Sequence, residues 1–173
     1  KDTKIQQMLI KNGADVNATD KYGRTALFYV TNCDVTKELL QHGANIFITD
    51  KTDKNMLYFL RSASVINTIK TINPDALRQL SNQPNRYNET PLHWATDIDA
   101  IKALIISGAD VNAQNVRGTT PLHWAANAQI AQLLIDNGAD PNARNDRGAT
   151  PLHWVESPEI AKTLIDNGAD INI

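Results

Sequence analysis

The sequence predicts an all-α repeat protein, a solenoid in which short helical units stack on one another. The first observation is an identical internal repeat, because Thr-Pro-Leu-His-Trp occurs at residues 90–94, 120–124 and 150–154. The second is an apolar stripe with helical spacing after each copy, as at Leu134 and Ile135. Self-similarity with a period of 20–50 residues is typical of solenoids, in which each unit buries its apolar face against its neighbours.

Composition limits the classes of protein that need to be considered. The chain has 173 residues, a formal net charge of −2 and 42% hydrophobic residues, which is typical of folded domains and not of disorder. It has no apolar run long enough for a transmembrane helix, and its near-neutral charge gives no general attraction to nucleic acid or membranes. Cys33 is the only cysteine, which excludes an internal disulfide and fits a reducing compartment. We therefore expect a cytoplasmic protein, or one in a host cytoplasm if an intracellular bacterium secretes it or a virus encodes it.

The repeats divide the chain into one array, residues 1–173. We expect a half repeat, then two repeats of which the second is degenerate, then three regular ones: residues 1–20, 21–50, 51–85, 86–115, 116–145 and 146–173. The first block lacks the first half of a repeat, which predicts a fragment of a longer protein.

The degenerate block, residues 51–85, departs from the pattern in three ways. Residues 55–59 replace the common motif, and five extra residues precede the next copy. Asn73 stands where the other blocks have a helix-ending glycine, and we expect it to act as a left-handed cap. Residues 74–80 are expected to form a short helix that starts at Pro74. Because its motif is broken, this block is predicted to be the weak joint of the stack.

The regular blocks carry a family resemblance. Thr-Pro-Leu-His-Trp-Ala-Ala at residues 120–126, followed by Gly-Ala-Asp-Pro-Asn at residues 138–142, resembles the ankyrin repeat, and the resemblance covers essentially the whole chain. It implies an ankyrin α-solenoid of stacked antiparallel helix pairs with projecting β-hairpin loops. Ankyrin repeats have about 33 residues, whereas the step here is 30. The missing residues fall between the two helices, so we expect a short first helix and a tight turn.

Histidine recurs once per regular repeat, at His93, His123 and His153. Three histidines suggest a metal site, but packed helices lie about 8–10 Å apart, and zinc needs its ligands about 2.0–2.1 Å from one point. We therefore predict no metal. Instead, each imidazole is expected to hydrogen-bond the threonine of its own turn and the backbone of the neighbouring loop.

An aromatic residue follows each histidine position. A column of aromatic rings is able to stack on bases or grip a ligand, but aromatic side chains more often serve packing, since each buries a large area. We interpret the column as structural. Its members are Tyr29, Phe59, Trp94, Trp124 and Trp154.

The hairpin tips carry the candidate binding residues. Each tip has at least one basic residue, and tyrosine and arginine are enriched at binding hot spots. In proteins of the resembled family, the tips and first helices commonly form the binding surface. The alternative is an ordinary solvated face. The candidates are Lys21, Tyr22, Arg24, Lys51, Lys54, Arg86, Tyr87, Arg117, Arg144 and Arg147.

No catalytic constellation is present in the sequence. It has no glycine-rich phosphate loop, no paired carboxylates at matching positions, and no serine or cysteine with a placed base. We therefore predict no catalytic residues, no cofactor and no small-molecule substrate. The favoured function is a non-enzymatic protein–protein interaction scaffold, with a host-directed effector module as one form of it. Two alternatives stay open: an electrostatic nucleic-acid or phosphoinositide binder that uses the basic tips, and an accessory domain of a larger enzyme.

Overall fold

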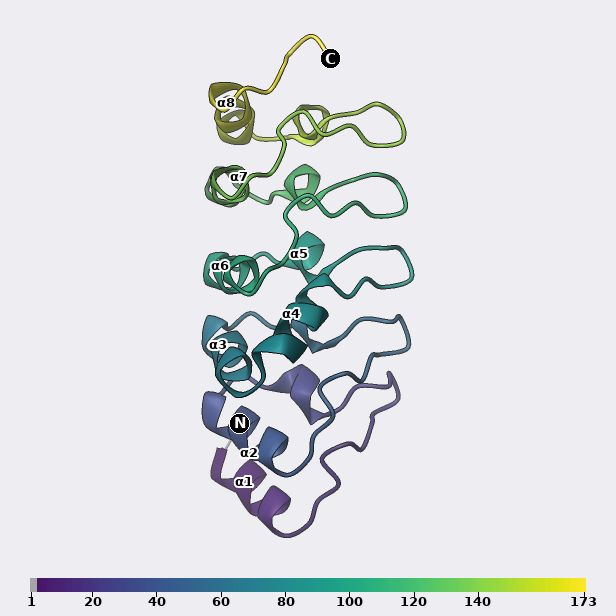
Figure 1. Cartoon of the computed structure of the whole chain (residues 1–173), viewed down its shortest axis with the longest axis vertical. Helices are drawn as coiled ribbons and strands as arrows, with labels where there is room; N and C mark the ends of the chain where they lie inside the picture. The colour runs from purple at the N-terminus through teal and green to yellow at the C-terminus, as the bar shows by residue number, and fades with distance from the viewer. Residues whose placement is uncertain (1–2) are drawn as a thin grey trace.

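The computed structural model describes residues 3–173 and shows a stack of similar units along one axis (Figure 1). Helices form one side of the stack, and the loops project from the other side, one from each unit. The outer helices are α1 (Thr3–Lys11), α2 (Cys33–Gln41), α3 (Ala63–Ile72), α6 (Ile98–Ile106), α7 (Ala128–Asp136) and α8 (Pro158–Asp166). The inner turns are η1 (Ala26–Tyr29), η2 (Met56–Tyr58), α5 (Pro91–Trp94), η3 (Pro121–Trp124) and η4 (Pro151–Trp154).

The inner elements are short, as the 30-residue period predicts. Each of the regular ones has four residues, starts at a proline, and is preceded by an extended threonine. Proline fits the first position of a helix because a backbone N–H at that position has no acceptor within the helix, so its absence in proline costs no hydrogen bond. The projecting loops turn back as hairpins, but no residue from 3 to 173 is in a β-strand. The predicted ankyrin-type solenoid is confirmed, with hairpins closed by a few hydrogen bonds instead of strand ladders.

Polar residues start most of the outer helices, and glycines follow the ends of all of them except α3. The side chains of Asn32, Asp97, Asn127 and Ser157 accept hydrogen bonds from the first backbone N–H groups of α2, α6, α7 and α8. At the other end of α6, Gly108 has φ +90°, and the next N–H, of Ala109, donates to the Leu104 carbonyl at 3.0 Å. A left-handed residue that closes the last turn in this way is a common helix stop, and it favours glycine.

The core lies between the inner turns and the outer helices. Leu92 and Leu122 of the inner turns are about as inaccessible as Leu104 and Leu134 of the outer helices, all at 3% exposure or less. Each regular repeat therefore contributes the same two apolar layers. Burial of such side chains is the main stabilising contribution, roughly 1.5–3 kcal/mol for each.

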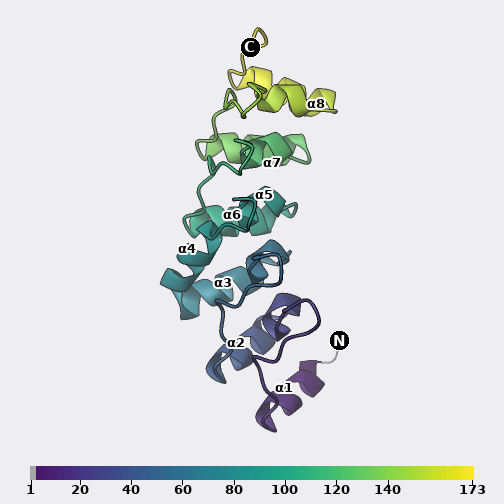
Figure 2. The same ribbon diagram turned by 90° about the vertical axis from the view of Figure 1, so that its right-hand side faces the viewer.

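The third block contradicts one of the structural expectations made for it and agrees with the other. Asn73 has φ −147°, so it is not a left-handed cap; it ends α3 and starts α4 (Pro74–Asn82), where its side chain accepts a hydrogen bond from Ala76 N at 3.0 Å. The expected helix after Pro74 is present and longer than predicted. Figure 2 shows α4 packed beside α3 and outside the regular column.

The inserted helix also changes the expectation of a weak joint. Five apolar side chains of α3 and α4 have 0% exposure: Val65, Ile66, Ile69, Leu77 and Leu80. The extra apolar surface of α4 fills the space that the broken motif would leave, so burial gives no sign of weakness in this block.

Asparagine side chains join successive units. The Asn112 amide donates to the Gly138 carbonyl at 2.8 Å and accepts from Asp140 N at 3.0 Å in the next repeat. In the third block, Asn82 at the end of α4 makes the same pair of bonds to Gly108 and Asp110. The insertion therefore restores the regular register before the fourth unit. Among residues 3–173, no helix is long and apolar enough to cross a membrane.

Candidate functional site

An Asx turn fixes the base of each projecting loop. Asn115 Oδ1 accepts from Arg117 N at 2.9 Å and from Thr119 N at 3.1 Å. The same arrangement recurs in the other four hairpins, at Asp20, Asp50, Asn85 and Asn145. Sequence reasoning missed these residues, although a recurring Asp or Asn two positions before the tip is a signal for such turns.

Backbone hydrogen bonds link most neighbouring tips. Val116 N donates to the Tyr87 carbonyl at 2.9 Å, and Asp146 N donates to the Arg117 carbonyl at 3.0 Å. Lys51 N bonds the first tip to the second in the same way. Between the second and third tips the Arg86 side chain makes the link, through Asp53 at 3.0 Å and the Lys51 carbonyl. The tips therefore form one continuous edge, and the hydrogen bonds between them fix the positions of neighbouring tips relative to one another.

The basic residues of the first tips are largely engaged within the protein. Arg24 is ion-paired with Asp50 at 2.9 Å, and its guanidinium carbon lies 4.1 Å from the centre of the Phe59 ring. Burial by itself would raise the pKa of Asp50, but hydrogen bonds from Thr52 and Arg24 outweigh it and lower that pKa. The pair is a structural clamp between two hairpins, so the expected role of Arg24 in partner binding does not fit its surroundings.

Lys54 and Arg86 are also engaged. The Lys54 ammonium lies 3.4 Å from the centre of the Trp94 ring, and burial lowers the pKa of Lys54 while Glu89 attracts its charge. Arg86 pairs with Asp53 on the exposed surface. An aromatic ring and a carboxylate of adjacent repeats already contact these two side chains, so their predicted role in partner binding stays a prediction and would require these contacts to be shared or broken.

Other predicted residues remain available at the surface. Lys51, Arg117, Arg144 and Arg147 are exposed, and none of their side chains has an ion pair or hydrogen-bond partner among residues 3–173. Three of the four lie in the fifth and sixth blocks. Lys21 is exposed as well and lies 5.0 Å from the centre of its neighbour's ring, that of Tyr22.

The two tip tyrosines are open to solvent. Tyr22 is 51% exposed and Tyr87 is 55% exposed. The Tyr22 ring lies close to Lys21 and to the ion-paired Arg24. Tyr87 belongs to the third tip, and the two tips that follow it carry the unpaired arginines. The available candidates therefore gather towards the C-terminal half of the array.

The tryptophan column is only partly buried, although its rings lie against one another; its structural interpretation stays a prediction. Trp94, Trp124 and Trp154 are each 43% exposed, with ring centres 6.5 and 6.3 Å apart. Because the inner helix is a single turn, its leucine points inwards and the tryptophan at its end lies at the surface. The indole N–H groups of Trp94 and Trp124 donate to Glu89 and Thr119 of their own hairpins, at 2.9 and 3.2 Å.

A hollow of about 290 Å³ lies where the free tips meet this column. Tyr87, Val116 and Arg117 come from the tips and Trp124 and Trp154 from the inner turns. The remaining lining residues, Glu89, Asn115 and Thr119, belong to the hairpin bases. This hollow brings predicted binding residues together with two residues that sequence reasoning assigned only to packing.

The histidines make the expected structural contacts. His93 Nδ1 accepts from Thr90 N at 3.1 Å and its Nε2 lies 3.1 Å from the Thr119 carbonyl in the next hairpin. His123 repeats this pattern with Thr120 and Ala149. His153 bonds only its own threonine in the part of the chain that is described. Within that part, no group of three His, Cys, Asp or Glu residues is placed to hold a metal ion.

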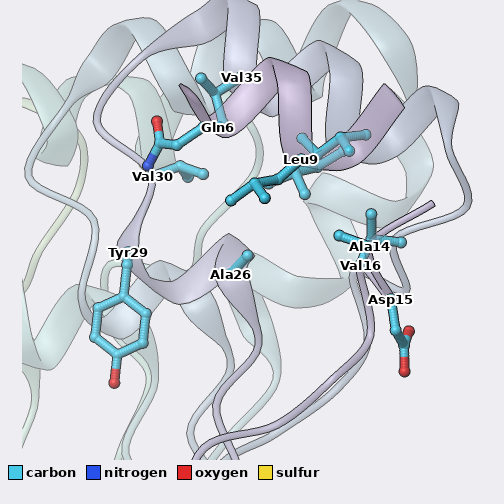
Figure 3. A pocket seen from close by; sticks show the side chains of 11 residues that line it. Gln6, Leu9, Ala14, Asp15, Val16, Ala26, Tyr29, Val30 and Val35 are labelled. Atoms are coloured by element: carbon cyan, nitrogen blue, oxygen red, sulfur yellow. The ribbon is translucent and has the colours of Figure 1, made fainter. Parts of the chain in front are cut away.

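A second hollow, of about 220 Å³, lies between α1 and η1 (Figure 3). Its walls are mainly apolar side chains such as Leu9, Val16 and Val35, with Tyr29 at one side. Small-molecule sites need a few convergent polar groups to orient a ligand. Here only Gln6 and Asp15 supply polar side chains besides the tyrosine, and Figure 3 shows the Asp15 carboxylate pointing away from the hollow.

Comparison with known families agrees with this architecture. Residues 96–173 match a family model described as ankyrin repeats in three copies, and residues 22–51 match one described as ankyrin repeat. Together these matches span more than half of the chain. No curated protein matches the sequence.

Proposed function

Since the chain belongs to the ankyrin-repeat family, whose repeats are generally protein–protein interaction modules and typically not enzymes, we propose that it is a non-enzymatic scaffold. Its partner is another protein, bound along the hairpin tips and the half-exposed tryptophans. The observation that carries this proposal is the exposed, unpaired Arg117, which lines one hollow with Tyr87 and Trp154. Arg144 and Arg147, further along the array, are also exposed and unpaired within residues 3–173. Exposed aromatic and arginine side chains in one place are the composition of a binding hot spot.

The shape of this region supports a macromolecular partner. The surface continues from one repeat to the next, and repetition along a solenoid gives an extended recognition surface. Its hollow is lined by charged and polar side chains as well as by tryptophan rings, whereas small-molecule sites are predominantly apolar.

The charges support an acidic or acid-rimmed partner. Unpaired surface arginines raise the rate of encounter with an opposite charge, and the effect falls with added salt. The engaged cations Arg24 and Lys54 contribute less, because their charges are already balanced within the array. We therefore place the main contact on blocks four to six and not uniformly along the chain.

The test starts with capture of candidate partners by the intact chain, followed by affinity measurements with one purified partner. Arg117→Glu combined with Arg147→Glu should lower the association rate at least tenfold at low salt, and added salt should reduce the difference. Tyr87→Ala should mainly raise the dissociation rate, since a buried aromatic anchor slows release.

The matched control reverses two exposed lysines on the outer helices, Lys37→Glu with Lys102→Glu, which changes the net charge by the same amount. This control should bind as the parent protein does. If the outer pair abolishes binding while the tip variants keep it, the partner contacts the opposite side of the solenoid and the proposal fails.

A further inference from the structure

Two cations in the first half of the array cover aromatic rings in the following repeat. The residue just before the first residue of the motif, which is Thr25 in the second block and Asn55 in the third, is Arg24 and Lys54, respectively. Arg24 lies over Phe59 at 4.1 Å, and Lys54 lies over Trp94 at 3.4 Å. In both cases a hairpin of one repeat supplies the cation and the inner turn of the next repeat supplies the ring.

The second half keeps the rings but lacks the cations. The equivalent residues are Glu89 in the fourth block and Thr119 in the fifth, and the rings that follow them are Trp124 and Trp154. No cationic group lies over either of these two rings within the described residues 3–173. The hollow of about 290 Å³ lies at this place, since both residues and both rings line it.

The hollow has an acidic group in its wall. Glu89 is 7% exposed, and its Oε2 accepts from Asn85 Nδ2 at 2.8 Å and from Trp94 Nε1 at 2.9 Å. These two donors fix the carboxyl group in position. A ring face together with a fixed carboxylate attracts a cation through the ring quadrupole and through direct charge attraction.

We propose that the hollow bounded by Glu89, Thr119, Trp124 and Trp154 binds one cationic side chain, a lysine or an arginine, of the partner protein. The cation takes the place in the fifth and sixth blocks that Lys54 takes against Trp94 within the chain. That the side chain comes from a protein rests on the proposed function, whereas the binding of a cation here does not.

Among the residues that line the hollow, only Arg117 is positively charged and would repel a cationic ligand. It is exposed, so solvent and salt screen its charge. In the partner, an acidic residue beside the lysine or arginine would pair with Arg117, which agrees with the acid-rimmed surface proposed above. Arg117→Gln should therefore increase the affinity for an isolated cation.

The test uses small compounds in place of the partner. The indole N–H signals of the three tryptophans are followed by NMR while N-acetyl-lysine methylamide is added to the full chain, with single Trp→Phe variants to assign the signals. The signals of Trp124 and Trp154 should shift saturably and that of Trp94 should not. The neutral norleucine analogue should bind about 2- to 30-fold more weakly, which is the range expected for a cation–aromatic contact.

Thr119→Lys supplies a cation from the protein itself. Residue 119 has the same position in the fifth block as Lys54 has in the third, so the new lysine should cover Trp154 of the following block as Lys54 covers Trp94. This variant should lose binding of the lysine compound. The matched variant Ala149→Lys should keep it, because it places a lysine at the same position of the sixth block, outside the hollow, and no aromatic residue follows among residues 155–173. Lys54→Met should make the Trp94 signal respond, which provides a second check if Thr119→Lys fails to fold.

Equal affinity for the lysine and norleucine compounds would overturn the proposal, as would tighter binding of the glutamate analogue through Arg117. Because the partner is absent from this titration, such a result leaves the proposed scaffold function standing. Loss of partner binding in the Arg117 and Arg147 variants, in turn, tests that function without reference to the hollow.

Discussion

The ammonium group of Lys54 lies 3.4 Å from the centre of the Trp94 ring, one repeat further along the stack. The contact crosses the boundary between the third and fourth units, so it contributes to their docking. Because the ammonium group contacts this ring, Lys54 is less available to bind a partner than the sequence alone indicates. Arg24, Lys54 and Arg86 thus make contacts within the protein, whereas Lys51 and the three arginines of the fifth and sixth blocks have no described side-chain partner.

The Lys54 contact predicts a measurable difference between two neighbouring lysines. Lys54→Ala should lower the free energy of unfolding by about 0.5–1 kcal/mol through loss of the cation–aromatic contact. Lys51→Ala is the control, since Lys51 is exposed and its side chain has no described partner; its effect should stay within about 0.5 kcal/mol. Urea denaturation followed by tryptophan fluorescence measures both, and equal effects would contradict the assignment.

The histidines give a graded prediction along the chain. His123→Ala should destabilise the protein by roughly 1–3 kcal/mol, because Thr120 N and the Ala149 carbonyl lose their partner. His153→Ala should cost less, since His153 is exposed and bonds only Thr150. Thermal denaturation of the two variants tests this order, and a reversed order would refute the proposed hydrogen-bond role.

The same histidines predict a loss of stability in mild acid. Burial lowers the pKa of His93 and of His123 below the ordinary value, so the folded state favours neutral rings. The unfolded chain then binds more protons than the folded chain as the pH falls below about 6.5. The free energy of unfolding should therefore be constant above neutrality and decrease from about pH 6.5 towards the lowered pKa values. Urea titrations between pH 5 and pH 8 test the sign, and a rise in stability on acidification would contradict it.

The inserted helix α4 predicts a strong effect in the block that the sequence marks as weak. Leu77 has 0% exposure, and Leu77→Ala should cost about 2–5 kcal/mol through lost burial and the cavity that remains. Gln79→Ala on the exposed side of the same helix is the control for helix propensity. Hydrogen exchange of the parent protein should show protection in α3 and α4 comparable to that in α6 and α7. Rapid exchange confined to α3 and α4 would instead restore the weak-joint interpretation.

Much of the fold was predictable because its causes are local. The threonine–proline start and the glycine stop define the boundaries of each regular unit from neighbouring residues alone. Asn73 could not be assigned correctly in this way. Its conformation depends on α4, whose apolar residues pack against α3, and on Asn82, which restores the register with Gly108.

The candidate site was predictable only in part. The sequence places Tyr87 and Arg117 at tips, but it does not show that Arg24 faces Asp50 or that Lys54 faces Trp94, since these contacts join residues from different repeats. The exposure of Trp124 also follows from the three-dimensional arrangement, because a single-turn helix leaves its last residue uncovered.

Site-specific photocrosslinking tests the central claim most directly, namely that the partner lies on the C-terminal hairpin tips. Benzoylphenylalanine is introduced at Tyr87 in one variant and at Ile106 in another; both positions are exposed, at 55% and 69%. Tyr87 belongs to a projecting hairpin and Ile106 to the outer helix α6, and Figure 1 shows the hairpins and the outer helices on opposite sides of the stack. With a purified partner, the account predicts covalent adducts from position 87 and none from position 106. Adducts from position 106 alone would contradict it.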